Sequence, residues 1–264
     1  MNNAALVAMA RRQMNTFRAA VMFLTRVPVG RAHEFRLEDL AGSAIYFPVV
    51  GALVGLSGGI ALLTSYVVPS FVAVLICMLV TLCITGGLHE DGLADCADGL
   101  VGGQDPERRL EIMKDSRIGA YGALALWFSL TAKLILIQSL LAVSIVTAVL
   151  AVVVAQSLGR ASTVALLAGL PYVRTGESKS SPFGNKVTHT QLGIGLVFPT
   201  ILSVALLHLD GLICLLAATA VTVACSFYFK RKIGGITGDC LGATNQLVEL
   251  SAYLSLAVLR PTNG

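Results

Sequence analysis

Residues 69–88, PSFVAVLICMLVTLCITGGL, form an apolar run without a charged side chain, and residues 89–99, HEDGLADCADG, follow it directly. A helix needs about 20 residues to cross a hydrocarbon layer about 30 Å thick, so the run is long enough to do so. The acidic stretch that follows therefore predicts a polar site at the edge of a membrane.

Composition extends this prediction to the whole chain. Of the 264 residues, 55% are hydrophobic and 13% are charged, whereas an ordinary soluble domain has about 25% charged residues. We therefore expect an all-α, polytopic integral membrane protein with about seven transmembrane helices, in which residues 1–264 form a single domain. The candidate spans are residues 41–67, 69–88, 118–142, 143–170, 191–209, 210–229 and 241–260, with Arg160 interrupting the fourth.

The basic residues predict the orientation of these spans. Sixteen of the 19 Lys and Arg residues lie in residues 1–40, in the loop after the second span, or directly after the fourth and sixth spans. The intervening turns near Val68, Leu141 and Asp210 contain no Lys or Arg. Since Lys and Arg accumulate in cytoplasmic loops, we expect segment 1–40 and loop 89–117 to be cytoplasmic and the C-terminus to lie outside. These loops also account for the net charge of +4, so no nucleic-acid partner is expected.

Three aspartates follow the second span at helical spacing. Asp91, Asp95 and Asp98 are at positions i, i+4 and i+7, which places them within about 60° on one stripe of a helix. Carboxylates this close repel one another unless a cation lies among them, and hard oxygen ligands suit Mg²⁺ or Mn²⁺. We predict a metal site here, with a hydrated helix end as the alternative.

A basic segment follows the acidic one in loop 89–117. It contains Arg108, Arg109, Lys114 and Arg117. An acidic, metal-binding stripe that faces a basic stripe suits a diphosphate substrate, because the metal neutralises some phosphate oxygens and Arg side chains bind others bidentately. The competing interpretation is that these charges only set the topology.

Further ionisable residues lie near the last span. Asp239 is in the glycine-rich segment 234–245, and the predicted topology places it on the same face as Asp91. It is predicted to bind a metal or position a substrate hydroxyl, with helix capping as the alternative. Arg160 and Glu249 lie about 13–15 Å deep at 1.5 Å per residue, and we expect them to pair because a lone charge in lipid is costly. Lys133 lies deeper and has no predicted partner.

Several motifs resemble one known family. The two central ones are residues 86–99, GGLHEDGLADCADG, and residues 110–122, LEIMKDSRIGAYG. Supporting segments in the same order are 23–28 (FLTRVP), 47–51 (FPVVG), 159–160 (GR), 171–174 (PYVR) and 237–243 (TGDCLGA). Together they resemble the cobalamin synthases, the adenosylcobinamide-GDP ribazoletransferases, over nearly the whole chain.

The resemblance implies a Mg²⁺-dependent protein of the bacterial inner membrane. Such an enzyme joins adenosylcobinamide-GDP to α-ribazole or its 5′-phosphate, giving adenosylcobalamin or its 5′-phosphate and GMP. Its partners are then these small molecules and the lipid bilayer. On this basis Asp91, Asp95 and Asp98 would hold one or two Mg²⁺ ions on the diphosphate, unless Asp91 accepts the hydroxyl proton. The predicted phosphate-binding residues are Lys114 and Arg117, with Arg160 or Arg174 as a further clamp.

Two other classes of protein share some features with this sequence. A CDP-alcohol phosphotransferase has the pattern Asp-Gly-x-x-Ala-Arg and later Gly-x-x-x-Asp-x-x-x-Asp. Asp91-Gly92-Leu93-Ala94 begins similarly, but Asp95 departs from the pattern and the later half is absent. An ion-coupled transporter favours ionisable groups near the bilayer midplane and inverted repeats, whereas the acids here are concentrated at one face.

Overall fold

A computed structural model describes residues 3–30, 42–173 and 187–261 of the chain. Every element in these ranges is a helix, apart from an isolated bridge between Tyr172 and Ile236. The helices are α1 (Asn3–Leu24), η2 (Ser43–Tyr46), α3 (Phe47–Ala61), η3 (Leu62–Tyr66), α4 (Ser70–Thr85), α5 (Leu88–Gly102), α6 (Pro106–Ile112), α7 (Ala120–Val143), α8 (Ile145–Gly169), α9 (His189–Leu207), α10 (Leu209–Ile233) and α11 (Gly238–Leu259). The predicted all-α, polytopic membrane architecture is confirmed.

The predicted number of seven spans is not confirmed. Within the described ranges, five helical segments are long and apolar enough to cross a membrane: Ser43–Tyr66, α7, α8, α9 and α10. A sixth arises if α4 and α5, which are bent by 86° relative to each other, count as one broken span. The seventh predicted span corresponds to α11, which carries Asp239 and Glu249 and is not among these segments.

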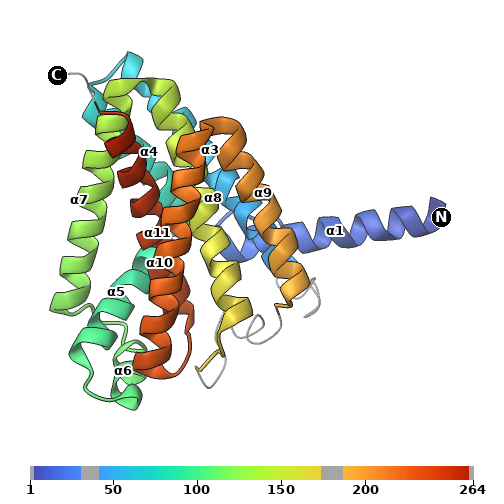
Figure 1. Ribbon diagram of the computed structural model, residues 1–264, viewed down its shortest axis with the longest axis vertical. Helices are drawn as coiled ribbons and strands as arrows, with labels where there is room; N and C mark the ends of the chain where they lie inside the picture. Colours follow the sequence, from blue (N-terminus) through green and yellow to red (C-terminus); the bar gives the residue numbers. More distant parts are fainter. Residues whose placement is uncertain (1–2, 31–41, 174–186, 262–264) are drawn as a thin grey trace.

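Helix α8 is the centre of the bundle. It packs against α3, α7, α9, α10 and α11 and is buried along most of its length. Figure 1 shows α8 near the middle of the bundle, between α10 and α9. Its position explains how Arg160, which interrupts an otherwise apolar run, avoids lipid: the residue is only 1% exposed.

Small residues bring α3 and α8 into close contact. Gly51, Gly55 and Gly59 are four residues apart and therefore share one face of α3. A Cβ atom at Gly55 would lie 2.7 Å from the Cα of Val153, and one at Gly59 would lie 2.9 Å from Cγ1 of Val149. A larger side chain would separate the helices, so these glycines permit the tight packing that membrane helices commonly use.

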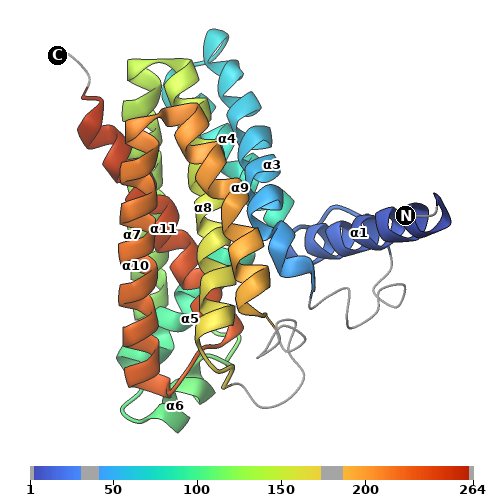
Figure 2. The ribbon, with the colours of Figure 1, turned by 45° about the vertical axis from the view of Figure 1, so that its right-hand side comes forward.

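The candidate site lies at one end of the bundle. In Figures 1 and 2, α5 and α6 lie at the end opposite the α7–α8 turn and the C-terminus, whereas α1 leaves the bundle sideways. The end of α10 reaches α6, because Arg109 donates a hydrogen bond at 2.9 Å to the carbonyl oxygen of Lys232. The acidic stretch and the basic end of α10 therefore share one face of the protein.

Candidate active site

Two glycines create a sharp bend between α4 and α5. Gly86 ends α4 with φ of 67°, and Gly87 precedes α5 with φ of 71°. Glycine occupies this left-handed region without the steric cost that a Cβ atom brings. The predicted span 69–88 therefore ends early, at Thr85, and α5 turns by 86° to run across the end of the bundle.

A polar pocket of about 430 Å³ lies at this bend. Asp91 and Asp95 both line it, as expected for residues one helical turn apart. Arg26 also lines it, together with Gly86 and Ser116. The structure thus brings two of the three predicted acidic residues together with a cation from a distant part of the chain.

Arg26 was not among the predicted site residues. Its backbone N–H donates a hydrogen bond to the carbonyl oxygen of Ile84 at 2.7 Å, which fixes the chain after α1 against the end of α4. Its side chain covers Gly86 so closely that a Cβ atom there would lie 2.8 Å from Cγ of Arg26. Nothing in the spacing of Arg26 along the sequence relates it to Asp91. Only its place in the motif FLTRVP could have identified it as a site residue.

Asp98 has a different environment from Asp91 and Asp95. Its Oδ2 accepts a hydrogen bond from the backbone N–H of Gly119 at 2.7 Å, and its Oδ1 accepts one from Gly122 at 2.9 Å. Gly119 is the N-cap of α7 and has no side chain with which to cap it, so Asp98 satisfies N–H groups that the helix start leaves open. A negative charge at this helix end is also favourable.

Asp239 lies beside the acidic helix, at the start of α11. The two helices cross at glycines: a Cβ atom on Gly92 would lie 3.1 Å from the Cα of Asp239 and 3.2 Å from that of Gly242. Thr237 caps α11 by accepting a hydrogen bond from the N–H of Cys240 at 3.3 Å. The hydroxyl of Thr237 donates to Oδ2 of Asp239 at 3.2 Å, so the cap of α11 is Thr237.

The predicted phosphate-binding residues lie in several places. Arg117 is exposed next to the pocket residue Ser116 and forms an ion pair with Asp115 at 2.6 Å. This pair lowers the pKa of Asp115 from 3.8 to about 2, chiefly through the side-chain hydrogen bond from Arg117. Lys114 is exposed after α6. Arg174 lies outside the described residues.

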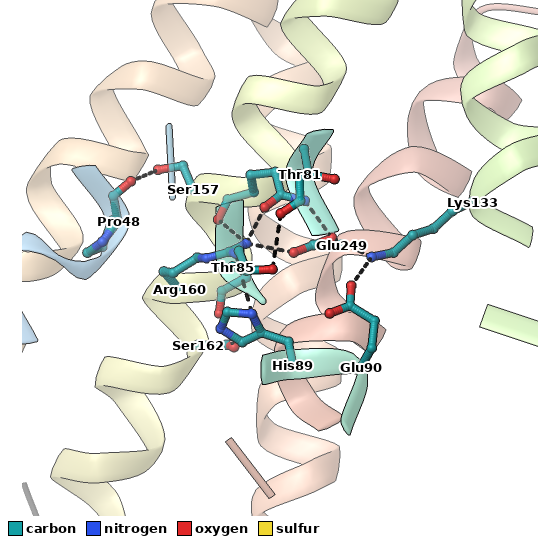
Figure 3. Close-up of polar contacts among 12 residues, drawn as sticks. Pro48, Thr81, Thr85, His89, Glu90, Lys133, Ser157, Arg160, Ser162 and Glu249 are labelled. Carbon is teal, nitrogen blue, oxygen red and sulfur yellow. Dashed lines mark hydrogen bonds and ion pairs between the residues drawn. The ribbon is translucent and has the colours of Figure 1, made fainter. Parts of the chain in front are cut away.

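Arg160 lies in a buried polar network (Figure 3). It donates to Oε1 of Glu249 at 2.7 Å, which confirms the predicted pair. Lys133, for which no partner was predicted, donates to Oε2 of Glu249 at 2.7 Å. The other guanidinium nitrogen of Arg160 lies 3.4 Å from Nδ1 of His89. The charge of Arg160 is thus paired inside the bundle, and its role as a phosphate clamp stays a prediction.

The pocket offers the donor chemistry that Mg²⁺ requires. In the described part of the chain, no three His, Cys, Asp or Glu side chains gather around one point. Mg²⁺ nevertheless usually binds one or two protein carboxylates and takes its other ligands from water and substrate phosphates. Asp91 and Asp95 supply such a pair of carboxylates in the same pocket.

Together, the fold and this site define a polytopic membrane protein with oppositely charged side chains in a pocket at one end of its bundle. The chain belongs to the cobalamin-5-phosphate synthase family, whose sequence model matches residues 16–257. No solved structure matches it.

Its relatives carry one name. Proteins named adenosylcobinamide-GDP ribazoletransferase are similar over almost the full length. One from Vibrio parahaemolyticus is 40% identical, with 94% of each chain covered. One from Leptothrix cholodnii is 41% identical, with 90% of this chain and 93% of the relative covered. One from Shewanella piezotolerans is 36% identical, with 94% of this chain and 97% of the relative covered.

Proposed function

We propose that this chain is a Mg²⁺-dependent adenosylcobinamide-GDP ribazoletransferase. It joins adenosylcobinamide-GDP to α-ribazole or its 5′-phosphate and releases GMP. A ribose hydroxyl oxygen attacks the phosphorus attached to cobinamide, a new P–O bond forms, and the P–O bond to GMP breaks. The observation that carries the proposal is the pocket in which Asp91 and Asp95 lie together with Arg26, in a chain of this family.

Asp91 and Asp95 are the residues that would hold Mg²⁺. When bound, the ion neutralises the diphosphate and lowers the cost of the charge that develops on it. We narrow the predicted ligand set to these two, because the Asp98 carboxylate is used at the start of α7. Asp239, beside Gly92, is the nearest further acidic residue from α11 and is proposed to orient the ribose.

The basic residues of the pocket and its edge bind phosphate. Arg26 reaches the pocket from outside α5 and binds phosphate oxygens through its planar fork of N–H donors. Lys114 and Arg117, close to Ser116 at the pocket edge, bind the leaving GMP phosphate. The hydroxyl proton passes to solvent water at the open side of the pocket, where Asp91 is exposed. Positioning and charge stabilisation supply most of the catalysis in phosphoryl transfer.

We further propose that the site faces the cytoplasm across a bacterial inner membrane. The pocket shares its end of the bundle with Lys230, Arg231 and Lys232, the last turn of α10. Lys and Arg collect on the cytoplasmic side of membrane proteins. A water-soluble nucleotide product is then released on the side where nucleotides are present.

The direct test is GMP release by the purified protein in lipid nanodiscs. Adenosylcobinamide-GDP, α-ribazole 5′-phosphate and Mg²⁺ are added together, and each is then left out in turn. We expect release only with all three. Asp91→Asn removes the charge at constant shape and should lower the rate by at least about 100-fold, as loss of one group that stabilises the charge of the transition state does.

A matched control is Glu111→Gln. Glu111 is an exposed carboxylate in the same polar segment and pairs with Arg108, so its variant should retain the wild-type rate. Well-folded wild-type protein that releases no GMP would overturn the proposal. Full activity of Asp91→Asn would overturn the role of the pocket.

A further inference from the structure

A second cavity, of about 320 Å³, lies between α4, α7 and α8. Its wall is mostly apolar and includes Leu75, Met78, Leu79, Leu130, Leu134 and Ile137. One end is polar, because Glu90, Lys133 and Gln156 also line the cavity. Apolar walls with a few polar groups at one end are typical of small-molecule sites of this size.

The polar end contains a carboxylate oxygen that forms no hydrogen bond with any residue the structure describes. Oε1 of Glu90 lies 3.8 Å from the ammonium of Lys133, whereas the buried Oε2 has no hydrogen-bond partner among the described residues. Lys133 is closer to Glu249, at 2.7 Å, and Figure 3 shows it between the two carboxylates. A buried polar atom without a partner costs free energy, so a ligand that donates a hydrogen bond to Glu90 would be favoured here.

The second cavity adjoins the pocket of Asp91 and Asp95. Glu90 lines the second cavity and Asp91 lines the first, and the two residues are consecutive on α5. On α7, Leu126 lines the first and Leu130 the second, which is about 6 Å along the helix axis. A two-ring base joined to a sugar is longer than this step, so it is long enough to reach from the second cavity to the pocket.

We propose that the second cavity binds the heteroaromatic base of the acceptor nucleoside. This inference rests on the proposed function, in which a ribazole, a two-ring base on ribose, supplies the attacking hydroxyl. The base packs against Leu130 and Leu134, and one ribose hydroxyl donates a hydrogen bond to the carboxylate of Glu90. The sugar then extends towards Asp91, where the reaction takes place.

The other ring systems of the reaction fit this cavity less well. Guanine carries amide and amino groups that need partners along its edges, and leaving them against leucine side chains is costly. The corrinoid macrocycle is too large for about 320 Å³. A mainly apolar base with one polar end towards its sugar matches the distribution of apolar and charged groups in the wall.

The test uses two neighbouring residues of α7. Leu134 lines the cavity, whereas Ile135 is 60% exposed on the outer side of the helix. Binding of α-ribazole to each variant in nanodiscs is measured by equilibrium dialysis, without the second substrate. Leu134→Trp fills the cavity and should weaken binding at least about tenfold, the cost of moderate overpacking, while Ile135→Trp should bind as the wild type does.

A second variant covers the case in which Leu134→Trp does not fold. Leu134→Ala enlarges the cavity, and it should raise the kcat/KM for a ribazole analogue with a third fused ring relative to that for α-ribazole. Its KM for adenosylcobinamide-GDP should stay unchanged. General destabilisation would not produce such a change in preference between acceptors.

The two proposals fail in different ways. If wild-type protein releases GMP but both tryptophan variants bind α-ribazole equally well, the assignment of the cavity is overturned and the proposed reaction stands. An unchanged acceptor preference in Leu134→Ala also overturns it. If the wild type neither binds α-ribazole nor releases GMP, both proposals are overturned.

Discussion

The carboxylate of Glu249 and the guanidinium of Arg160 form an ion pair of 2.7 Å in the interior of the bundle, and neither side chain is more than 2% exposed. The pair joins α11 to α8, the central helix. Lys133 of α7 contacts the other oxygen of Glu249 at 2.7 Å. One carboxylate therefore balances cations from two other helices, so the three helices depend on it together.

Removal of this carboxylate should be strongly destabilising. Glu249→Ala leaves Arg160 and Lys133 with less compensating charge in a buried site, and breaking a buried ion pair from one side costs about 3–5 kcal/mol. We expect a lower melting temperature in nanodiscs, with Glu107→Ala, a substitution at an exposed position of α6, as the control. A melting temperature equal to that of the wild type would show that the network does not hold α7, α8 and α11 together.

Sequence reasoning identified the Arg160–Glu249 pair but left Lys133 without a partner. Equal depth in the membrane was enough to predict this pair. Both residues lie about nine to ten residues from the same membrane face, at 1.5 Å per residue. That estimate misses Lys133, because it compares backbone depths, whereas the long side chain of Lys133 on α7 reaches Glu249 on α11 at 2.7 Å.

At the acidic site, too, the sequence predicted contacts within one helix but not contacts between helices. Helical spacing predicted that Asp91 and Asp95 share one side of a helix, a relationship local to α5, and both residues line one pocket. It could not predict that the start of α7 uses Asp98, nor that Arg26 lines the pocket. Both relationships join segments that are distant in sequence, and they depend on the way the helices pack.

Asp98 and Asp91 should differ in their effect on the Mg²⁺ requirement. Asp98→Ala removes the acceptor for Gly119 and Gly122, so it should destabilise the protein by about 1 kcal/mol, as loss of a helix cap does. The Mg²⁺ concentration that gives half-maximal activity should be the same for Asp98→Ala as for the wild type. For the residual activity of Asp91→Asn, that concentration should be higher. Equal shifts in both variants would make Asp98 a metal ligand.

Two adjacent glycines allow the effect of the contact between Gly86 and Arg26 to be separated from the effect of backbone strain. Gly86→Ala and Gly87→Ala both place a side chain in the left-handed region, at a cost of roughly 1–2 kcal/mol each. Only at Gly86 would the new Cβ atom meet Arg26; at Gly87 the nearest atom is Cδ1 of Leu82 at 3.8 Å. GMP release should therefore fall further in Gly86→Ala than in Gly87→Ala, at similar melting temperatures. Equal rates would exclude a functional contact between Gly86 and Arg26.

The Asp115–Arg117 pair predicts a titration at low pH. The pKa of Asp115 is lowered from 3.8 to about 2 in the folded protein. Its contribution to stability is therefore fully present above 3.8 and is lost as the pH falls towards 2. NMR titration of ¹³C-labelled aspartate carboxyl groups in micelles should show this low midpoint. In Arg117→Gln the midpoint should return towards 3.8, and an unchanged midpoint would mean that Arg117 is not its cause.

Arg26 offers a test of how the pocket recognises phosphate. Lys at this position keeps the positive charge but loses the planar fork that binds two oxygens at once. Loss of one charge-assisted hydrogen bond costs about 1.5–3 kcal/mol, so Arg26→Lys should raise the KM for adenosylcobinamide-GDP by roughly 10- to 100-fold. Arg26→Ala should be weaker still, and Arg108→Lys, at an exposed position of α6, should leave KM unchanged. If Arg26→Lys matches the wild type, the residue provides only charge, and bidentate binding of the diphosphate at this position is excluded.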